Sequence, residues 1–521
     1  MLLKKCGKTK KYKMTIEYVG HACLLIDTGN IKIVTDPWFD GPAYCNQWYI
    51  FRKPVNAEKI KSADVILYSH GHEDHLHEKS LLHFSKKAKI FYPYNWYGGV
   101  KNYFNSLGFK NAKEAITAKK YTLSKNTSVT YFANGLDSII VIEHNGKVVV
   151  NINDALHAYP SGVIAFFCHE VLKTFPKIDL VFSGYGGASY FPNTIHFPGK
   201  NEEEIARVRE QQFVHNFCKI VTLLNPKSAI PFAADFALLE KEKKWINKTK
   251  FKPLEVADYF QKYFPTQSQS IKIIDMYSGD VLENNVLISK SPYRNELTSK
   301  GLSYLIDTQY EIEIRQKNEE QYITEQEAIS LKSAIIQNIH SRKHWLKNEP
   351  KNLNFCIILE DIKTTNYYNV RIHQMDISIE RHHYSFPENE LDIRTRSSIL
   401  NYSFSGEWGG DALTIGYGAE FYFKNKESVE KRTDTLCLTL LTQHPKASIH
   451  AKTHPLRTIR YFMGNPVTRK WSLNKLKGNK AYENKTVYAN DWLLRNKCEI
   501  CQICDLPLMD DKFNAELDFK S

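Results

Sequence analysis

The sequence predicts a layered α/β domain over residues 14–300 and a smaller α+β domain over residues 301–521. Short apolar runs typical of buried strands alternate with helical segments and hairpins through the first of these ranges. After about residue 300 the pattern changes to one long helix followed by strand-like segments. A chain of 521 residues is also too long for a single compact core, so two or three domains are expected.

The predicted strands of the first domain follow one another in a regular order. They are IEYVGHACLLID (16–27), IKIVTDP (31–37), DVILYS (64–69), KIFYPYN (89–95), SIIVIEH (138–144), KVVVNIND (147–154), IDLVFSGYGG (178–187) and KSAIPFAADF (227–236). Asn145-Gly146 predicts a hairpin turn between two of them. Helical spacing is found in LHEKSLLHFSKK (76–87), VKNYFNSLGF (100–109) and residues 201–224, where Asn201 is the expected N-cap.

The second domain is expected to start with a helix over 323–345 and to continue with strands over 353–361 and 367–380. The sequence contains no internal repeat, and no long low-complexity linker separates the two domains. The chain ends in a CxxCxxC segment, which is counted with the second domain.

Composition and charge restrict the partners and the compartment. The net charge is +13, and basic residues concentrate in 450–480, but no recognisable nucleic-acid motif accompanies them. We therefore expect a solvated basic face or an anionic small-molecule substrate rather than a nucleic acid. Residues 1–13 form a basic tail with no apolar segment behind it, and no apolar run reaches about 18 residues. A cytoplasmic protein without a transmembrane segment is expected.

Residues 68–78 read YSHGHEDHLHE and combine four histidines with three carboxylates. The pattern His70-x-His72-x-Asp74-His75 comes directly after a predicted buried strand, where closely spaced side chains can converge on one point. Imidazole and carboxylate groups suit zinc, iron or manganese. We expect one or two divalent ions, one on His70 and His72 and a second on Asp74 and His75. Two adjacent ions would share and activate a water molecule, whereas iron could instead activate dioxygen.

Two histidines and a glycine-rich loop are secondary candidates. His21 lies in the first predicted strand, where a core histidine is as good an interpretation as a site residue. His157 lies just beyond a predicted strand and could reach a metal or substrate, or lie on a surface loop. The loop that contains Gly186, Gly187 and Ser189 could offer N–H groups to a bound anion or form a tight structural turn.

Three cysteines near the C-terminus, Cys498, Cys501 and Cys504, have a spacing that can hold zinc or an iron–sulfur cluster. Such a cluster would supply electrons to the chain. No fourth cysteine adjoins them, and Cys437 could complete a site only through folding, so an accidental trio is the alternative. The other cysteines are widely spaced and are expected to be reduced.

The histidine pattern resembles the metallo-β-lactamase superfamily. GHACLLI (20–26) and TDPW (35–38) resemble the opening strands of that fold, with Asp36 near the site. Asp154 stands where the superfamily places its metal-bridging carboxylate. The resemblance implies a four-layer αββα sandwich with metal ions at one edge, and catalytic roles for Asp74 and Asp154.

A closer resemblance is to the catalytic region of the CMP-N-acetylneuraminate hydroxylase family. It is carried by TDPWFDGPAYCNQWYI (35–50), YSHGHEDHLH (68–77), FSGYGGASYFPNTIHFPGK (182–200) and PFAADF (231–236), and a weaker likeness continues through WGGDALTIGYGAEF (408–421). The resemblance implies an iron-dependent hydroxylation of a small anionic, nucleotide-sugar-like substrate.

The sequence departs from these families in three places. The hydroxylases carry a Rieske iron–sulfur domain ahead of this region, which we expect to be absent here, so that an external protein would donate electrons. The third histidine of the superfamily would fall in 129–141, where Asn134 or Asp137 occupies the neighbourhood instead. A last histidine is replaced by Asp235 and Glu240. One metal site is therefore expected to be carboxylate-rich, weakly occupied or lost, and carboxylates would favour iron or manganese over zinc.

Three functions remain open at this point. The first is an oxygenase with a mononuclear or dinuclear iron site, supplied with electrons by a separate protein or by the cysteine trio. The second is a zinc hydrolase of a phosphodiester, ester or lactone, in which Asp74 also orients the nucleophile. The third is a degenerate scaffold, against which the intact histidine motif argues. In either enzyme the metal ligands would be His70, His72, Asp74, His75 and Asp154.

Overall fold

The computed structural model describes most of the chain. The described residues are 14–50, 53–93, 100–134, 137–188, 190–240, 242–295, 323–342, 352–362, 367–373, 376–405, 409–442, 455–467, 469–470, 473, 477, 497–503 and 505–508. The basic tail (1–13), Ser189, Cys504 and the side chain of Cys498 lie outside the described part.

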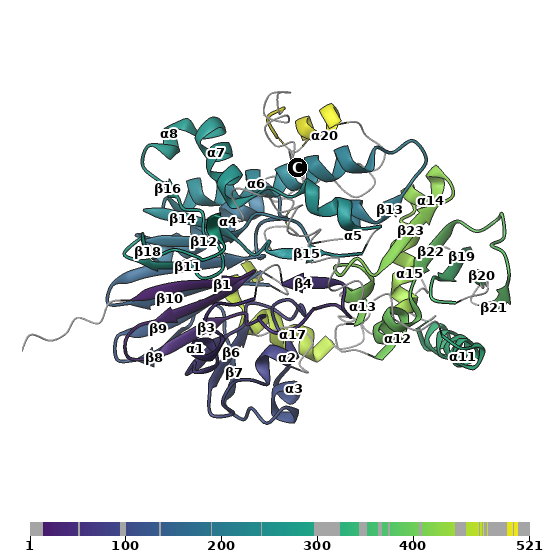
Figure 1. Cartoon of the computed structure of the whole chain (residues 1–521), viewed down its shortest axis with the longest axis horizontal. Coiled ribbons are helices and arrows are strands. Elements are labelled where there is room, and N and C mark those ends of the chain that lie inside the picture. The colour runs from purple at the N-terminus through teal and green to yellow at the C-terminus, as the bar shows by residue number, and fades with distance from the viewer. Residues whose placement is uncertain are drawn as a thin grey trace, which may run out of the picture.

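Two large mixed sheets pack face to face and form the centre of the first domain (Figure 1). In spatial order, the eight strands of the first sheet are β18 (Val286–Ser289), β17 (Val281–Glu283), β1 (Thr15–Gly20), β2 (Cys23–Asp27), β3 (Lys32–Thr35), β5 (Val65–Leu67), β6 (Lys89–Pro93) and β7 (Ala112–Ala115). The seven strands of the second sheet are β16 (Lys272–Ile273), β14 (Ser228–Phe232), β12 (Leu180–Gly184), β11 (Lys147–Asn153), β10 (Ser138–His144), β9 (Thr127–Ala133) and β8 (Lys120–Ser124). A two-stranded ribbon of β4 (Trp48–Ile50) and β15 (Phe236–Leu238) lies beside them.

Helices cover the outer faces of both sheets. A core that includes Ile26, Tyr131 and Phe182 fills the space between the sheets. Apolar side chains on the outer face of the first sheet pack against α1 (Ala57–Lys61), α2 (Glu78–Leu81) and α3 (Val100–Ser106). Those on the outer face of the second sheet pack against α4 (Ser161–Thr174), α6 (Glu202–Leu224) and α7 (Pro253–Tyr263). A 3₁₀ helix (Lys244–Thr249) precedes α7 in the chain, and α8 (Pro265–Ser268) follows it. The expected αββα sandwich is therefore confirmed.

Local sequence signals explain several of these elements. Asn145 and Gly146 have φ values of 51° and 79°, as a tight hairpin turn between β10 and β11 requires. The side chain of Asn201 accepts a hydrogen bond from the Glu204 N–H at 3.2 Å and caps α6. One expectation was wrong: residues 16–27 form two strands rather than one, because the chain reverses at His21, which has a φ of 49°.

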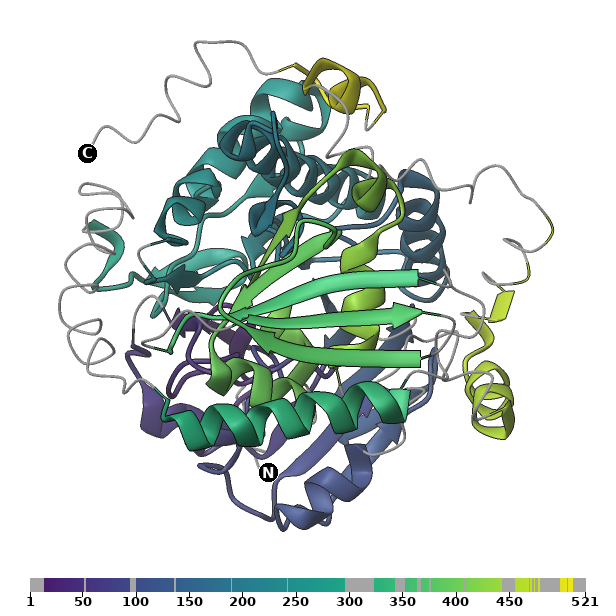
Figure 2. The ribbon, with the colours of Figure 1, turned by 90° about the vertical axis from the view of Figure 1, so that its right-hand side faces the viewer.

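A third sheet dominates the second half of the chain and is seen face-on in Figure 2. Its strand order is β13 (Ile195–His196), β23 (Ala419–Phe423), β22 (Leu391–Thr395), β19 (Asn352–Leu359), β20 (Tyr367–His373) and β21 (Asp376–His382). The accompanying helices are α5 (Tyr190–Asn193), α11 (Glu325–Arg342), α12 (Ser397–Ser405), α13 (Gly409–Leu413), α14 (Lys426–Glu430) and α15 (Thr433–Leu441). Because β13 pairs with β23, the segment at 195–196 contributes a strand to a sheet whose other strands follow residue 350.

Two short helices complete the described chain. They are α17 (Pro455–Gly464) and α20 (Lys497–Ile503). Helix α20 packs on α6, where the Gln211 side chain donates a hydrogen bond to the Pro507 carbonyl at 2.7 Å. Cys501 is buried there, and metal binding by the cysteine trio stays a prediction. Within the described residues no helix has the length and apolar character needed to cross a membrane.

The stability of the first domain is expected to depend on pH through His215 of α6. This side chain is buried, its Nδ1 atom lies 3.1 Å from the Tyr259 hydroxyl, and burial lowers its pKa to about 3. The unfolded chain takes up a proton below about pH 6.5, so the stability due to neutral His215 is lost as the pH falls from there toward 3. Between pH 7 and pH 4.5 the free energy of unfolding should fall by about 2–3 kcal/mol more in the natural protein than in His215→Gln. Urea unfolding at both pH values measures this difference, and equal pH dependence in the two proteins would contradict it.

Candidate metal centre

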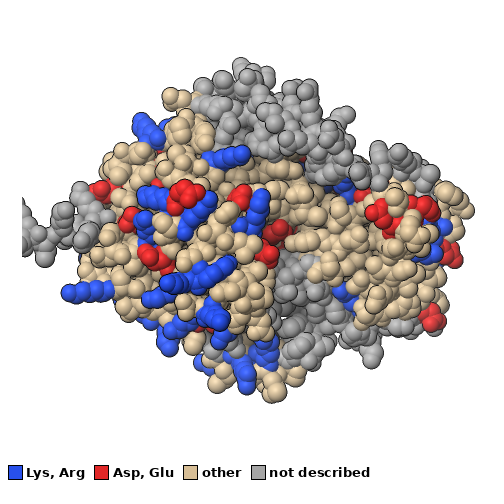
Figure 3. Space-filling model, turned by 60° about the horizontal axis from the view of Figure 1, so that its bottom comes forward, with Lys and Arg blue, Asp and Glu red and all other residues tan. Residues whose placement is uncertain are grey.

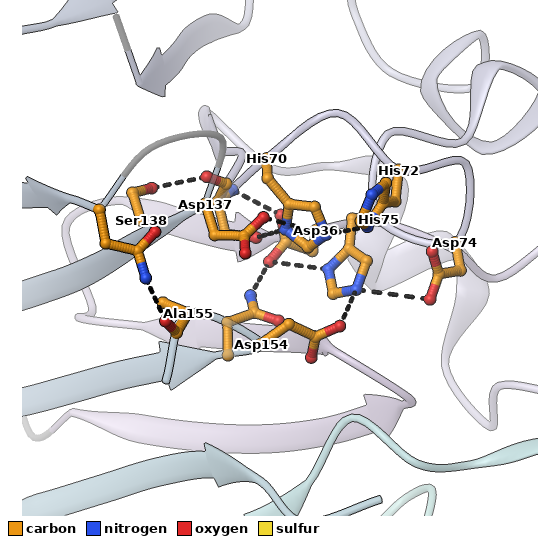
Figure 4. A network of polar contacts seen from close by, with 12 residues as sticks. Asp36, His70, His72, Asp74, His75, Asp137, Ser138, Asp154 and Ala155 are labelled. Atoms are coloured by element: carbon orange, nitrogen blue, oxygen red, sulfur yellow. Dashed lines mark hydrogen bonds and ion pairs between the residues drawn. The ribbon is translucent and has the colours of Figure 1, made fainter. Parts of the chain in front are cut away.

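A cluster of histidine and aspartate side chains lies at one edge of the sandwich, where β3, β5 and β11 end (Figure 4). β3 and β5 are parallel neighbours, so their carboxyl ends meet at the same edge. Asp36 directly follows β3, His70 lies in the loop after β5, and Asp154 directly follows β11. The fold thus gathers side chains that are far apart in the sequence.

His70 and His72 meet Asp137, which lies in the loop between β9 and β10. The Nε2 atom of His70 lies 2.8 Å from Nδ1 of His72 and 4.0 Å from Oδ1 of Asp137. Ligand atoms of the three residues all lie within 4.8 Å of one another. Burial, together with the neighbouring His75 and His72, holds the pKa of His70 well below its usual value, which keeps this ring in the neutral form that binds metals. Asp137 therefore stands where a third ligand would complete a site with the two histidines.

His75 is surrounded by three carboxylates. Its Nε2 atom lies 3.4 Å from Oδ2 of Asp74 and 3.5 Å from Oδ2 of Asp154, and its Nδ1 atom lies 3.5 Å from Oδ2 of Asp36. Both ring nitrogens are buried, and neither has a hydrogen-bond partner among the described residues. Buried ring nitrogens normally have one, and the negative charge of three carboxylates around one imidazole can be balanced by protonation of the ring or by a bound cation. The residues present therefore fit a divalent cation.

The charges of the cluster shift the pKa values of its members. Burial by itself lowers the pKa of His75, but Asp74 and Asp154 raise it well above the usual value. Burial would raise the pKa of Asp74, yet His75 and His21 hold it well below its usual range. Burial by itself raises the pKa of Asp154, but His157 and His75 lower it by more, so the pKa is below its usual value. Both carboxyl groups are therefore ionised at neutral pH and available to a cation.

His21 reaches the cluster from the turn between β1 and β2. Its Nε2 atom lies 2.8 Å from Oδ2 of Asp74, and ligand atoms of His21, Asp74 and His75 lie within 4.8 Å of one another. The backbone at His21 is left-handed, with a φ of 49°, and the ring faces the Asp74 carboxylate. His21 thus contacts the same carboxylate as His75, either to orient it or to share in metal binding.

Asp36 acts on the cluster through His75. It is fully buried, and its Oδ1 atom accepts a hydrogen bond from the Ser69 N–H at 2.7 Å. Its Oδ2 atom accepts from the Asn153 side chain, and the Ser138 hydroxyl donates to the Ser69 carbonyl at 2.6 Å. With both oxygens fixed, the carboxylate can hold the His75 ring in one orientation, which is the usual role of such a partner beside a metal ligand.

His157 and Asn134 brace the loop that carries Asp154. The Nδ1 atom of His157 donates to the Asp154 carbonyl at 2.7 Å, and its ring lies 5.0 Å from that of Phe213. The Asn134 side chain donates to the Ala155 carbonyl. Of the two residues expected near the missing third histidine, Asn134 thus supports the backbone, whereas Asp137 reaches the histidines.

Asp235 and Glu240, which were expected to replace the last histidine of the superfamily, lie outside the cluster. Asp235 accepts a hydrogen bond from the Tyr18 hydroxyl, and Glu240 forms an ion pair with Lys243 at 2.7 Å. Neither joins a metal-type group of His, Cys, Asp and Glu within the described residues. Tyrosine and lysine satisfy these carboxylates, and His21 is the additional histidine near Asp74.

The glycine-rich loop packs closely against α6. The Gly187 N–H lies 3.2 and 3.3 Å from the two carboxylate oxygens of Glu210, so the protein itself uses this donor. A Cβ atom on Gly187 would lie 2.2 Å from the Phe213 ring, and one on Gly186 would lie 2.8 Å from Ala234. Close packing therefore accounts for both glycines, and substrate binding by this loop stays a prediction.

Comparison with known protein families addresses the expected resemblance. Residues 15–161 match the family model described as the beta-lactamase superfamily domain, and this range contains every histidine and aspartate of the cluster. The expected resemblance is confirmed. The match to the family model covers the first of the two expected domains only in part, and it ends before the strands of the third sheet.

Several curated relatives are named as hydroxylases. The cytidine monophosphate-N-acetylneuraminic acid hydroxylase of Danio rerio is 23% identical over 439 residues, which covers 78% of this chain and 68% of the relative. The Xenopus laevis enzyme of the same name is 27% identical over 262 residues, covering 46% and 41%. The Homo sapiens protein, named as inactive, is 26% identical over 275 residues, covering 48% and 51%. The last two matches span about half of those relatives, and the names of the first two relatives agree with the expectation of an enzyme.

Solved structures with some similarity include a hydroxylase and a hydrolase. CmlA, a diiron β-hydroxylase from Streptomyces venezuelae, has a TM-score of 0.34 and 16% identity, covering 52% of this chain and 54% of that one. Igni18, a metallo hydrolase from Ignicoccus hospitalis, has a TM-score of 0.33 and 14% identity, covering 52% and 98%.

Proposed function

We propose that the protein is an iron-dependent hydroxylase that acts on a small anionic substrate. The proposal rests mainly on Asp137, whose carboxylate stands 4.0 Å from His70 in the group that also contains His72. Asp74 and Asp154 add two further carboxylates beside His75. Oxygen-rich mixed ligand sets favour iron or manganese over zinc, which prefers nitrogen and sulfur.

Each residue of the cluster has a defined task in this proposal. His70, His72 and Asp137 would hold one ion, and Asp74, His75 and Asp154 would hold a second. When bound, the iron would supply the redox chemistry that inserts one oxygen atom of dioxygen into a substrate C–H bond and reduces the other atom to water, with two electrons from a separate donor protein and two protons from solvent. Asp74 and Asp154 remain ionised and balance the charge of the ions.

The anionic substrate is supported by charge close to the cluster. The Arg209 guanidinium lies 4.6 Å from the centre of the Phe213 ring, and the His157 ring lies 5.0 Å from the same ring. His157 in turn donates to the backbone of Asp154. A cation two side chains away from a metal ligand would attract a carboxylate or phosphate group. The hydroxylases named above have an anionic sugar nucleotide in their name.

Metal analysis of anaerobically purified protein tests the proposal. We expect redox-active iron at one or two ions per chain, and consumption of dioxygen when a chemical reductant is added. Zinc at full occupancy, with no redox-active iron, would refute the hydroxylase and leave the hydrolase. The hydrolase draws support from the same geometry, because two neighbouring ligand groups can also hold two zinc ions around one water molecule.

A further inference from the structure

The second half of the chain contacts the metal-binding loop directly. The Tyr402 hydroxyl of α12 donates to Oε2 of Glu73 at 3.2 Å, and Glu73 lies between His72 and Asp74 in the sequence. This contact joins residues 329 positions apart. Gly416, also in the second half of the chain, packs against Tyr44, since a Cβ atom placed on it would lie 2.5 Å from Cβ of Tyr44.

Tyr44 lies in an unusual stretch of backbone. Tyr44, Cys45 and Asn46 have φ values of 54°, 56° and 65°, so three consecutive residues other than glycine adopt the left-handed conformation. Residues with a Cβ atom rarely adopt this conformation in succession, and it persists only where the surroundings impose it. The turn is followed by Trp48, whose ring lies 4.9 Å from that of Tyr44 and stacks on Phe236 at 3.5 Å.

This strained turn places the Tyr44 side chain within hydrogen-bonding distance of Asp74, one of the proposed metal ligands. The buried Tyr44 hydroxyl donates to Oδ1 of Asp74, while Oδ2 of the same carboxylate faces His21 and His75. The hydroxyl therefore fixes which oxygen of Asp74 points into the cluster. Strained backbone that places a donor on a ligand-type carboxylate indicates a functional constraint rather than a packing accident.

We propose that Tyr44 and Tyr402 are positioning residues for the metal loop, and that the second half of the chain thereby sets the metal affinity of the β-lactamase-like site. This inference rests on the proposed metal binding, and neither tyrosine is assigned contact with substrate. Tyr44 acts on Asp74 directly, with the backbone of Gly416 packed behind it. Tyr402 acts through Glu73 on the two ligands beside it in the sequence.

Cobalt(II), added to metal-free protein, is the probe for Tyr44. Tyr44→Phe removes one hydroxyl without leaving a large cavity, and we expect its dissociation constant for cobalt to rise about tenfold or more. The visible absorption of bound cobalt should also change, because one carboxylate no longer has a fixed orientation. A purely structural role would lower the melting temperature without changing that spectrum. Affinity within twofold of the natural protein, with the same spectrum, would overturn the proposal.

Tyr402→Phe tests the contribution of the second half of the chain. We expect about threefold weaker cobalt binding, in keeping with the loss of one hydrogen bond to a carboxylate. Tyr422→Phe is the matched control, because the Tyr422 hydroxyl also donates to a carboxylate, that of Glu420 at 2.7 Å, on β23 away from the cluster. If Tyr402→Phe binds cobalt as Tyr422→Phe does, the second half of the chain does not set the affinity. If the natural protein binds no cobalt, the proposed metal site itself fails.

Discussion

Replacing His70 by alanine is expected to abolish metal binding and activity together. His70 takes part in two groups of potential ligands, one with His72 and Asp137 and another with His75 and Asp154. Its loss therefore removes an imidazole ligand from the first proposed ion and a ring that lies beside His75, a ligand of the second. Because the loss of even an outer partner of a ligand lowers metal affinity by roughly 10–100-fold, the loss of a ligand itself should lower it by at least about 100-fold. Metal content after anaerobic dialysis, followed by dioxygen consumption, measures both effects.

His83→Ala is the matched control for this experiment. His83 lies on the surface a short distance along the chain, where its Nε2 atom contacts Oδ2 of Asp40 at 2.6 Å. The variant should keep the metal content of the natural protein. Full metal content in His70→Ala after dialysis would show that the cluster is not the metal site.

The part of the site that the sequence could predict is the part that is local in the chain. His70, His72, Asp74 and His75 lie within six residues after one strand, so spacing alone indicates that they converge. Asp154 was predicted from the resemblance to the superfamily, which places its metal-bridging carboxylate at the end of that strand. A layered α/β domain was predicted from the alternation of apolar runs with helical segments, whereas its four αββα layers were implied by the resemblance.

Contacts that depend on long-range packing left no such signal. Tyr402 reaches Glu73 across 329 residues, and nothing in either sequence neighbourhood predicts that pairing. Tyr44 lay within a motif that carries the family resemblance, but its role depends on three left-handed residues that no propensity rule anticipates. His21 was ambiguous because its strand was expected to continue, whereas the turn at this residue directs the ring toward Asp74.

Replacing Asp137 by histidine is expected to shift metal preference from iron toward zinc. Asp137 is one of the two residues expected near the position of the superfamily's third histidine, and its Oδ1 atom lies 4.0 Å from Nε2 of His70. Burial raises the pKa of Asp137, although the nearby His72 opposes this shift. A bound cation would therefore stabilise the ionised form of this carboxyl group. A third imidazole would remove one negative charge and supply the nitrogen ligand that zinc prefers. We expect the ratio of bound zinc to bound iron to rise by about tenfold.

Anaerobic equilibration with equal concentrations of both ions, followed by metal quantification, measures this ratio. Asp137→Asn is the matched control, because it removes the same charge but keeps an amide oxygen and adds no imidazole. It should bind both ions more weakly, and its ratio of zinc to iron should stay closer to that of the natural protein than the ratio of Asp137→His. If Asp137→His keeps the ratio of the natural protein, Asp137 is not a ligand. In that case the preference for iron would have to come from Asp74 and Asp154, the two carboxylates at the opposite side of His75 from Asp36.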